Sequence, residues 1–215
     1  MAVNSKDAER AVETFLKAVG VDMEEQNMRR TPARVAEMYA YLFGGLGRDP
    51  AEAFGPPITA EAGGFIAVRG IPFFSMCEHH LVPFYGTVDI VYAPEGGRIA
   101  GFSRFCEAVA IAAHRPQLQE RLTQDIADAV QRGLGASGVL VLCRATQLCM
   151  TLREGGSYGT ETTTSATLGT FESDKLLAQQ AWNLLLPIVT SHSKAFPLGE
   201  GGARQGDGKG GEGTT

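Results

Sequence analysis

Apolar residues recur at helical spacing in the first fifty residues. In the segment 7–19 they fall on one stripe of a helix, and Gly20 is a suitable residue to end it. A second helix is predicted from Thr31, which suits an N-cap, and Pro32, which suits the first turn. The stripes consist of Val12, Phe15, Leu16 and Val19 in the first helix and of Val35, Met38 and Leu42, expected to be buried, in the second. We assign residues 1–50 to an N-terminal helical segment.

The pattern changes to strand-like alternation between residues 64 and 93. A short run, FIAVRG at 65–70, precedes YGTVDIVYA at 85–93, in which alternate residues face opposite sides. One side consists of Gly86, Val88, Ile90 and Tyr92, and the other of Tyr85, Thr87, Asp89 and Val91. The stretch MCEHHLVPF at 76–84 is predicted to form the turn between the two strands.

Helical and strand-like patterns alternate in the second half of the chain. Two helices are predicted at 102–114 and 118–134, with a break at Pro116. Val-rich and Thr-rich runs favour strands, and a last helical pattern follows them. These segments are 138–145, 148–154 and 160–169 for the strands and 173–187 for the helix. We expect an α+β fold in which antiparallel strand pairs carry helices on one face, within a domain at 51–190. The glycine-rich tail at 191–215 is predicted to be disordered.

Composition and charge narrow the class of protein. Hydrophobic residues make up 44% and charged residues 20% of the 215 residues, as in ordinary soluble globular proteins. The net charge of −5 argues against a broad nucleic-acid-binding surface, and no apolar run of 18 residues predicts a membrane span. The start of the chain lacks the pattern of a secretory signal, so we expect a cytoplasmic protein whose four cysteines stay reduced.

Candidate chemistry gathers in the predicted turn at 76–84. Cys77 and His80 form a C-x-x-H pair, a spacing that lets two side chains bind one ion. A third ligand must come from elsewhere, and Cys149 is the best candidate, whereas Cys106 and Cys143 lie among apolar residues and are expected in the core. The alternative is a buried Cys77 beside two histidines that make hydrogen bonds in a turn. The spacing by itself leaves both interpretations open.

Longer motifs identify a family. The segments that carry the resemblance are RTPARVAEMY, SMCEHHLVPFYGTVDIVYAP, IAGFSR, RPQLQERLT, LCMTLRE and TETTTSATLGTF. In that order, over roughly residues 28–172, they resemble GTP cyclohydrolase I. The resemblance implies the tunnelling fold, in which strand pairs of several subunits close into a barrel, commonly a homo-oligomer of ten subunits with active sites between them. It also implies a reaction of pterin biosynthesis. That reaction opens the imidazole ring of GTP at C8, releases formate and closes the product to dihydroneopterin triphosphate.

The resemblance also implies roles for individual residues. Zn²⁺ would be held by Cys77, His80 and Cys149, and His79 beside them would transfer protons. Guanine would be recognised by Gln119 and Glu120, because a carboxylate accepts hydrogen bonds from the N–H groups of the ring and the exocyclic amine. The residues that would hold the triphosphate are Arg34, Ser103, Arg104 and Arg153.

Two positions depart from the family pattern. Where the family has His-x-Cys, this chain has Gln147 before Cys149, and glutamine does not titrate near neutral pH. Where the family has an arginine four residues after its serine, this chain has Glu107, and Glu154 adds a second negative charge after Arg153. A carboxylate that faced the pocket would repel a triphosphate.

These departures leave three functions open. The first is a complete zinc-dependent GTP cyclohydrolase. The second is a specialised relative that opens the ring of a guanine compound with fewer or no phosphates and retains the formyl group. The third is a non-catalytic zinc-binding scaffold that binds guanine or pterin. The three apparent zinc ligands, His79 and Glu120 favour an enzyme.

Overall fold

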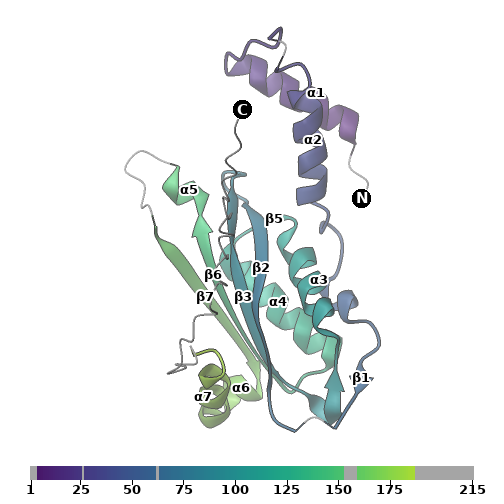
Figure 1. Cartoon of the computed structure of the whole chain (residues 1–215), viewed down its shortest axis with the longest axis vertical. Helices are drawn as coiled ribbons and strands as arrows, with labels where there is room; N and C mark the ends of the chain where they lie inside the picture. Colours follow the sequence, from purple (N-terminus) through teal and green to yellow (C-terminus); the bar gives the residue numbers. More distant parts are fainter. Residues whose placement is uncertain (1–3, 26, 62, 153–158, 187–215) are drawn as a thin grey trace, which may run out of the picture.

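The N-terminal helices project from one end of the molecule and touch the rest of it at the C-terminal part of the second helix (Figure 1). The structure is a computed structural model, and it describes residues 4–186 except 26, 62 and 153–158 (Figure 1). Helices α1 (Ser5–Ala18) and α2 (Thr31–Leu42) form a pair above one end of the sheet (Figure 1). The helix that we predicted to begin after a Thr31 cap has Arg30 at the cap instead, and Pro32 lies in the first turn as expected.

Five strands among the described residues form a curled sheet in the order β5–β2–β3–β6–β7. Neighbours are antiparallel, except that β5 runs parallel to β2. Their bounds are Ile66–Cys77 for β2, Pro83–Ala93 for β3, Pro116–Gln117 for β5, Gly138–Gln147 for β6 and Glu161–Gly169 for β7. Short elements complete the lower end: η1 (Pro50–Phe54), η2 (Glu95–Gly97) and the β1–β4 pair (Ile58–Thr59 with Arg98–Ile99).

Helices α3 (Phe102–Ala113) and α4 (Gln119–Leu134) pack on one face of this sheet. The predicted stripe of β3 supplies that core, with Val88, Ile90 and Tyr92 completely buried. The other face is covered in its lower part by α6 (Thr170–Ser173) and α7 (Lys175–Asn183), which pack on outward apolar residues such as Val91 and Leu140. The prediction that the helices lie on one face of the sheet is therefore correct for α3 and α4 and wrong for α6 and α7.

The predicted strand at 148–154 is wrong where the structure describes it. Strand β6 pairs with β3 up to Gln147, opposite Phe84, and has no further partner residue in that register. The chain then forms one helical turn, α5 (Leu148–Thr151), so Cys149 lies on a helix. The prediction of a core Cys106 is also wrong, because Phe105 takes the buried position on α3 and Cys106 is exposed, whereas Cys143 is buried as expected.

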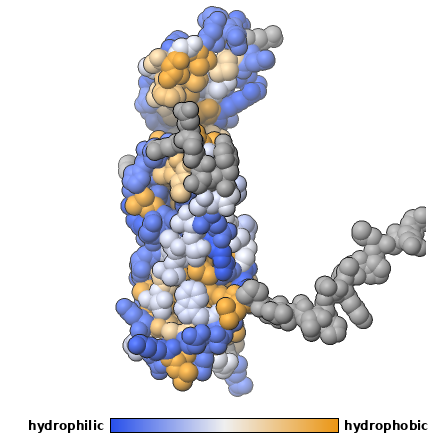
Figure 2. Space-filling model, turned by 90° about the vertical axis from the view of Figure 1, so that its left-hand side faces the viewer, coloured by the Kyte–Doolittle hydropathy of each residue, from blue (hydrophilic) through white to orange (hydrophobic). Residues whose placement is uncertain are grey.

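Apolar side chains of the N-terminal helices face solvent in the single chain. None of the described residues of α1 is buried, and Met38 of the predicted α2 stripe is half exposed. Figure 2 shows apolar residues gathered on this upper part of the molecule. The predicted tail at 191–215 lies outside the described residues. Within the part of the chain that is described, no helix is both long and apolar enough to cross a membrane.

Candidate metal and substrate site

The turn between β2 and β3 is held in a defined conformation. The Cys77 amide donates to the Val82 carbonyl at 2.9 Å, and the Leu81 amide donates to the Cys77 carbonyl at 2.8 Å. Leu81 has a φ of 50°, a left-handed conformation that is costly for a branched side chain and needs support from its surroundings. Part of that support comes from α2, where the Tyr39 hydroxyl donates to the Leu81 carbonyl at 3.0 Å. These hydrogen bonds together hold the turn in its conformation.

The three predicted metal ligands meet at this turn. Within the described residues, the ligand atoms of Cys77, His80 and Cys149 all lie within 4.8 Å of one another, and Cys77 Sγ lies 3.8 Å from His80 Nδ1. Thiolate and imidazole ligands on a tetrahedral zinc ion lie about 3.6–3.8 Å apart, given the usual bond lengths. Two sulfurs and one nitrogen at this spacing fit a zinc ion that keeps a fourth position open. Cys149 arrives because β6 runs beside β3 to the end of the sheet.

A cavity of about 190 Å³ opens beside these three residues. Its lining includes the predicted residues His79, Gln119, Glu120 and Gln147 together with Cys77 and Cys149. Glu120 is exposed in the first turn of α4, where the positive end of the helix dipole favours a carboxylate. The structure therefore brings together the predicted metal ligands, the proton-transfer histidine and the guanine-recognition carboxylate.

Two of the three glutamines that line the cavity, Gln119 and Gln147, are hydrogen-bonded to each other. Gln147 Nε2 donates to Gln119 Oε1 at 2.7 Å. Gln119 Nε2 donates in turn to the carbonyls of Cys143 at 3.2 Å and Thr162 at 2.9 Å, so the protein uses both of its N–H groups. Gln119 is buried and fixes the position of the Gln147 amide, whereas Glu120 is exposed.

The predicted triphosphate residues lie elsewhere in the chain. Ser103 and Arg104 are in the first turn of α3, and this helix of 12 residues, about 18 Å long, ends beside the cavity. Glu107 on the same helix pairs with Arg104 at 3.2 Å and Arg48 at 3.7 Å. Arg34 is exposed on α2, and Arg153 and Glu154 lie outside the described residues. One chain by itself does not bring Ser103 and Arg104 to the cavity.

His114 is placed away from the metal cluster. It follows the last residue of α3 and stacks on Phe74 with ring centroids 4.8 Å apart. It lines a different cavity, of about 370 Å³, with Tyr41 and Arg48. Burial lowers the pKa of His114, which favours the neutral imidazole.

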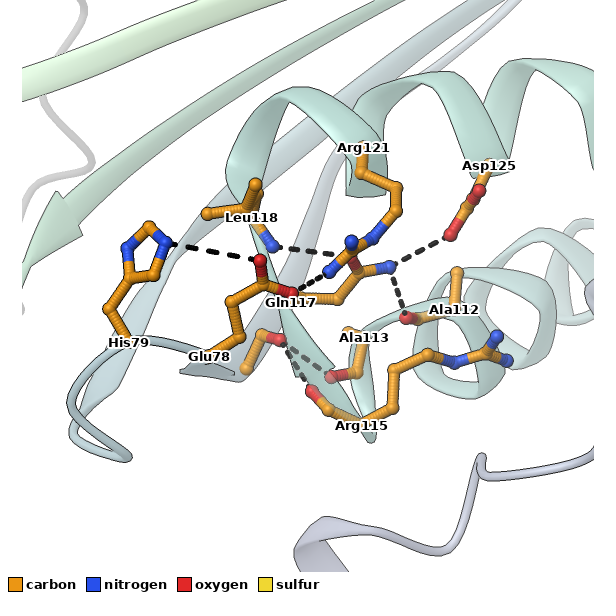
Figure 3. A network of polar contacts seen from close by, with 10 residues as sticks. Glu78, His79, Ala112, Ala113, Arg115, Gln117, Leu118, Arg121 and Asp125 are labelled. Atoms are coloured by element: carbon orange, nitrogen blue, oxygen red, sulfur yellow. Dashed lines mark hydrogen bonds and ion pairs between the residues drawn. The ribbon is translucent and has the colours of Figure 1, made fainter.

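Sequence reasoning missed the residues that hold the turn against α4. Figure 3 shows Glu78 of the turn pointing toward Arg121 of α4 and, on its other side, toward His79. The sequence offered one clue to this pair, because the motifs CEHH and QERLT each contain a further charged residue, Glu78 and Arg121. Their pairing depends on the short parallel bridge between β2 and β5, which no periodicity indicates.

Comparisons with known proteins agree with these motifs. A family model described as GTP cyclohydrolase I matches residues 8–185. GTP cyclohydrolase 1 of Streptococcus pyogenes is 43% identical over 188 residues, which cover 87% of this chain and 97% of that protein. GTP cyclohydrolase 1 of Geobacillus sp. (strain WCH70) is 41% identical over 183 residues, which cover 85% and 97%. The crystal structure of the archaeosine synthase QueF-Like in the apo form aligns with 51% of this chain and 97% of its own, at 17% identity and a TM-score of 0.42, too low to bear on the fold.

Proposed function

The chain belongs to the GTP cyclohydrolase I family, and on this premise we propose that it hydrolyses the imidazole ring of GTP at C8 in a zinc-dependent reaction. The products are formate and dihydroneopterin triphosphate. The observation that supports this proposal best is the cluster of Cys77, His80 and Cys149 beside a cavity that Glu120 and His79 also line. A scaffold that only bound guanine would need no metal site with an open position next to a base-recognition carboxylate.

The cavity divides the chemistry among its residues. Cys77, His80 and Cys149 would hold the zinc ion, which would supply a Lewis acid that makes water nucleophilic at neutral pH. The Glu120 carboxylate accepts hydrogen bonds from the N–H groups of guanine and so selects against adenine. His79 lies on the exposed side of the turn, where its imidazole gives and takes the protons that ring opening moves.

Assembly completes the site in this proposal. Because Ser103 and Arg104 begin a helix that ends at the cavity, they reach a triphosphate only when a neighbouring copy presents its own α3. We propose a homo-oligomer, a decamer as in the resemblance, in which curled sheets close into a barrel. The cytoplasm suits this protein, because a reducing compartment keeps the cysteine ligands as thiols.

A product assay tests the proposal. The zinc-loaded protein is incubated separately with GTP, GMP, guanosine and guanine, while formate and the mass of the product are followed. Formate together with a fluorescent pterin from GTP is the expected result. Turnover of GMP or guanosine in preference to GTP would instead identify a substrate with fewer or no phosphates. No reaction with any of the four compounds would leave a non-catalytic guanine- or pterin-binding scaffold and would overturn the proposal.

A second candidate function follows from Gln147. Its amide lies at the cavity and is hydrogen-bonded to Gln119, so this position offers no group that titrates near pH 7. Water attack and ring opening need the zinc site and His79, whereas loss of formate needs a further proton transfer. The enzyme of this second candidate therefore stops at a formamidopyrimidine nucleotide, with the mass of the substrate plus one water.

The substitution Gln147→His distinguishes the two functions. If the chain lacks a proton-transfer group here, the variant should release formate about 10²-fold faster, the lower end of what a placed general acid or base contributes. Formate release and product mass are measured in parallel with Gln124→His, a matched change on the exposed side of α4. If the products and the rate of formate release stay the same, Gln147 does not limit the reaction.

A further inference from the structure

Glu78 connects the metal-ligand turn to the helix that carries Glu120. Its carboxylate forms an ion pair with Arg121 Nη2, and its other oxygen lies 3.9 Å from His79 Nε2 (Figure 3). The backbone is tied as well, because the Glu78 amide donates to the Gln117 carbonyl at 3.0 Å. Glu78 lies between Cys77 and His79 in the sequence, so its contacts with α4 and β5 hold the stretch of backbone that carries a predicted metal ligand and the predicted proton-transfer histidine.

Arg121 also forms a hydrogen bond with the buried side chain of Gln117, which fixes its orientation. Arg121 Nε donates to Gln117 Oε1 at 2.7 Å, and the Leu118 amide donates to the same oxygen at 3.2 Å. Gln117 Nε2 donates to Asp125 at 2.8 Å and to the Ala112 carbonyl at 3.3 Å. All donors and acceptors of this fully buried amide are thus in use, which leaves it one orientation. The guanidinium plane of Arg121 takes its direction from that amide.

We infer that Arg121 is a positioning residue, whose guanidinium holds the metal-ligand turn at a fixed spacing from the guanine-recognising first turn of α4. Arg121 follows Glu120 in the sequence, and Glu78 follows Cys77, so one ion pair joins the two halves of the cavity. This inference rests on the proposed function. There the guanine ring, bound by Glu120, must lie within reach of the attacking water at the predicted metal site. A guanidinium fork suits the role, because it contacts Glu78 and Gln117 at once, whereas a lysine ammonium has no such planar fork.

The spacing between the metal-ligand turn and the first turn of α4 decides how often the bound guanine lies within reach of the attacking water. Misplacing reacting groups by about 1 Å costs roughly 10²-fold in rate. Arg121 is not among the residues that line the cavity, so its loss leaves the contacts of Glu120 with the base unchanged. The expected signature is therefore a lower kcat at nearly constant KM.

The test compares Arg121→Gln with Arg132→Gln. Both arginines lie on α4 and pair with one carboxylate, and their side chains are similarly exposed, at 46% for Arg121 and 57% for Arg132, but Arg132 contacts Asp49 at the other end of the helix. The zinc-loaded, assembled proteins are assayed for kcat and KM with GTP, zinc per chain and thermal midpoint. We expect Arg121→Gln to lower kcat about 10–100-fold, with KM within threefold and zinc retained, and Arg132→Gln to leave kcat unchanged.

A second readout does not depend on turnover. Backbone amides of residues 77–82 should exchange with solvent deuterium at least tenfold faster in Arg121→Gln than in the unchanged protein, and at the unchanged rate in Arg132→Gln. If Arg121→Gln does not fold, Glu78→Gln removes the ion pair and should show the same pattern, while Arg121→Lys should recover part of kcat. Equal kcat in Arg121→Gln and the unchanged protein, or unaltered exchange, would overturn the inference. If the unchanged protein has no activity but exchange in the turn still depends on Arg121, the proposed function fails, whereas the role of Arg121 in holding the turn stands.

Discussion

The two ends of the α3–α4 helix pair carry similar charged residues in different surroundings. Where α3 ends and α4 begins, Arg121 contacts Glu78, and its direction is set by the buried amide of Gln117. Where α3 begins and α4 ends, Arg104 pairs with Glu107 and Arg132 with Asp49 on the surface. One end is organised around a cavity beside the Cys77, His80 and Cys149 side chains, whereas the arginines and carboxylates described at the other end pair with each other.

In the proposed function, this difference separates two tasks of one substrate site. Attack on a ring needs groups held to within a fraction of an ångström, which buried amides and a fixed turn provide. Phosphate binding by flexible, exposed arginines tolerates rearrangement, because surface ion pairs contribute only about 0.2–1 kcal/mol each. Substitutions at the cavity end should therefore change the chemistry, and those at the opposite end should change affinity or stability.

The largest effect is expected from Cys149→Ser. Serine does not form the thiolate ligand that zinc favours, so zinc content should fall and turnover of GTP should drop roughly 10³-fold or more. Metal analysis and formate release check both quantities. Cys106→Ser is the matched control, since this exposed cysteine lies on α3 away from the cluster and should keep zinc and activity. Full activity of a zinc-free Cys149→Ser would remove the metal from the mechanism.

Glu107→Arg tests the opposite end at a smaller scale. The substitution changes the local charge by two units and frees Arg48 and Arg104 from their shared carboxylate. Two charges near 4 Å interact by about 1–4 kcal/mol between dielectric constants of 80 and 20, so affinity for GTP should rise about tenfold or more. Binding of GTP and of guanosine is compared, with Glu172→Arg on α6 as the control for net charge. Equal gains for both ligands would place Glu107 away from the phosphates.

The cavity end was also the part that the sequence predicted better. The C-x-x-H spacing and the choice of Cys149 predicted three side chains that lie close together in the structure, because one turn of chain and the end of β6 meet there. The roles of His79 and Glu120 come from the resemblance and stay predictions. Helices α3 and α4 followed from strong apolar periodicity. The helix at Cys149 was missed because it depends on where the pairing of β6 with β3 ends.

Other features depended on tertiary structure in ways that no local pattern reports. The α3 segment is apolar enough that either Phe105 or Cys106 could have been buried, and one residue of helix rotation decides between them. The pairing of Glu78 with Arg121 crosses 43 residues and requires the β2–β5 bridge. Ser103 lies far from the cavity because it begins α3, whose last residues lie near the cavity. The direction of α3 depends on how it packs on the sheet, which the local sequence does not define.

The smallest effect is expected from Arg132→Gln, measured as stability against pH. The Arg132 hydrogen bond and then the Ala51 amide lower the pKa of Asp49 to about 2. A lowered folded-state pKa gives stability that is present above the unfolded value, near 3.9, and is lost as pH falls toward 2. Because both side chains are more than a third exposed, solvent screening keeps the contribution below about 1 kcal/mol. Urea unfolding at pH 7 should give a slightly lower free energy of unfolding for Arg132→Gln than for the unchanged protein. This difference in free energy should shrink between pH 4 and pH 2. A deficit that persisted at pH 2, or a loss of kcat as large as that of Arg121→Gln, would mean that the two ends of the helix pair do not differ as their surroundings imply.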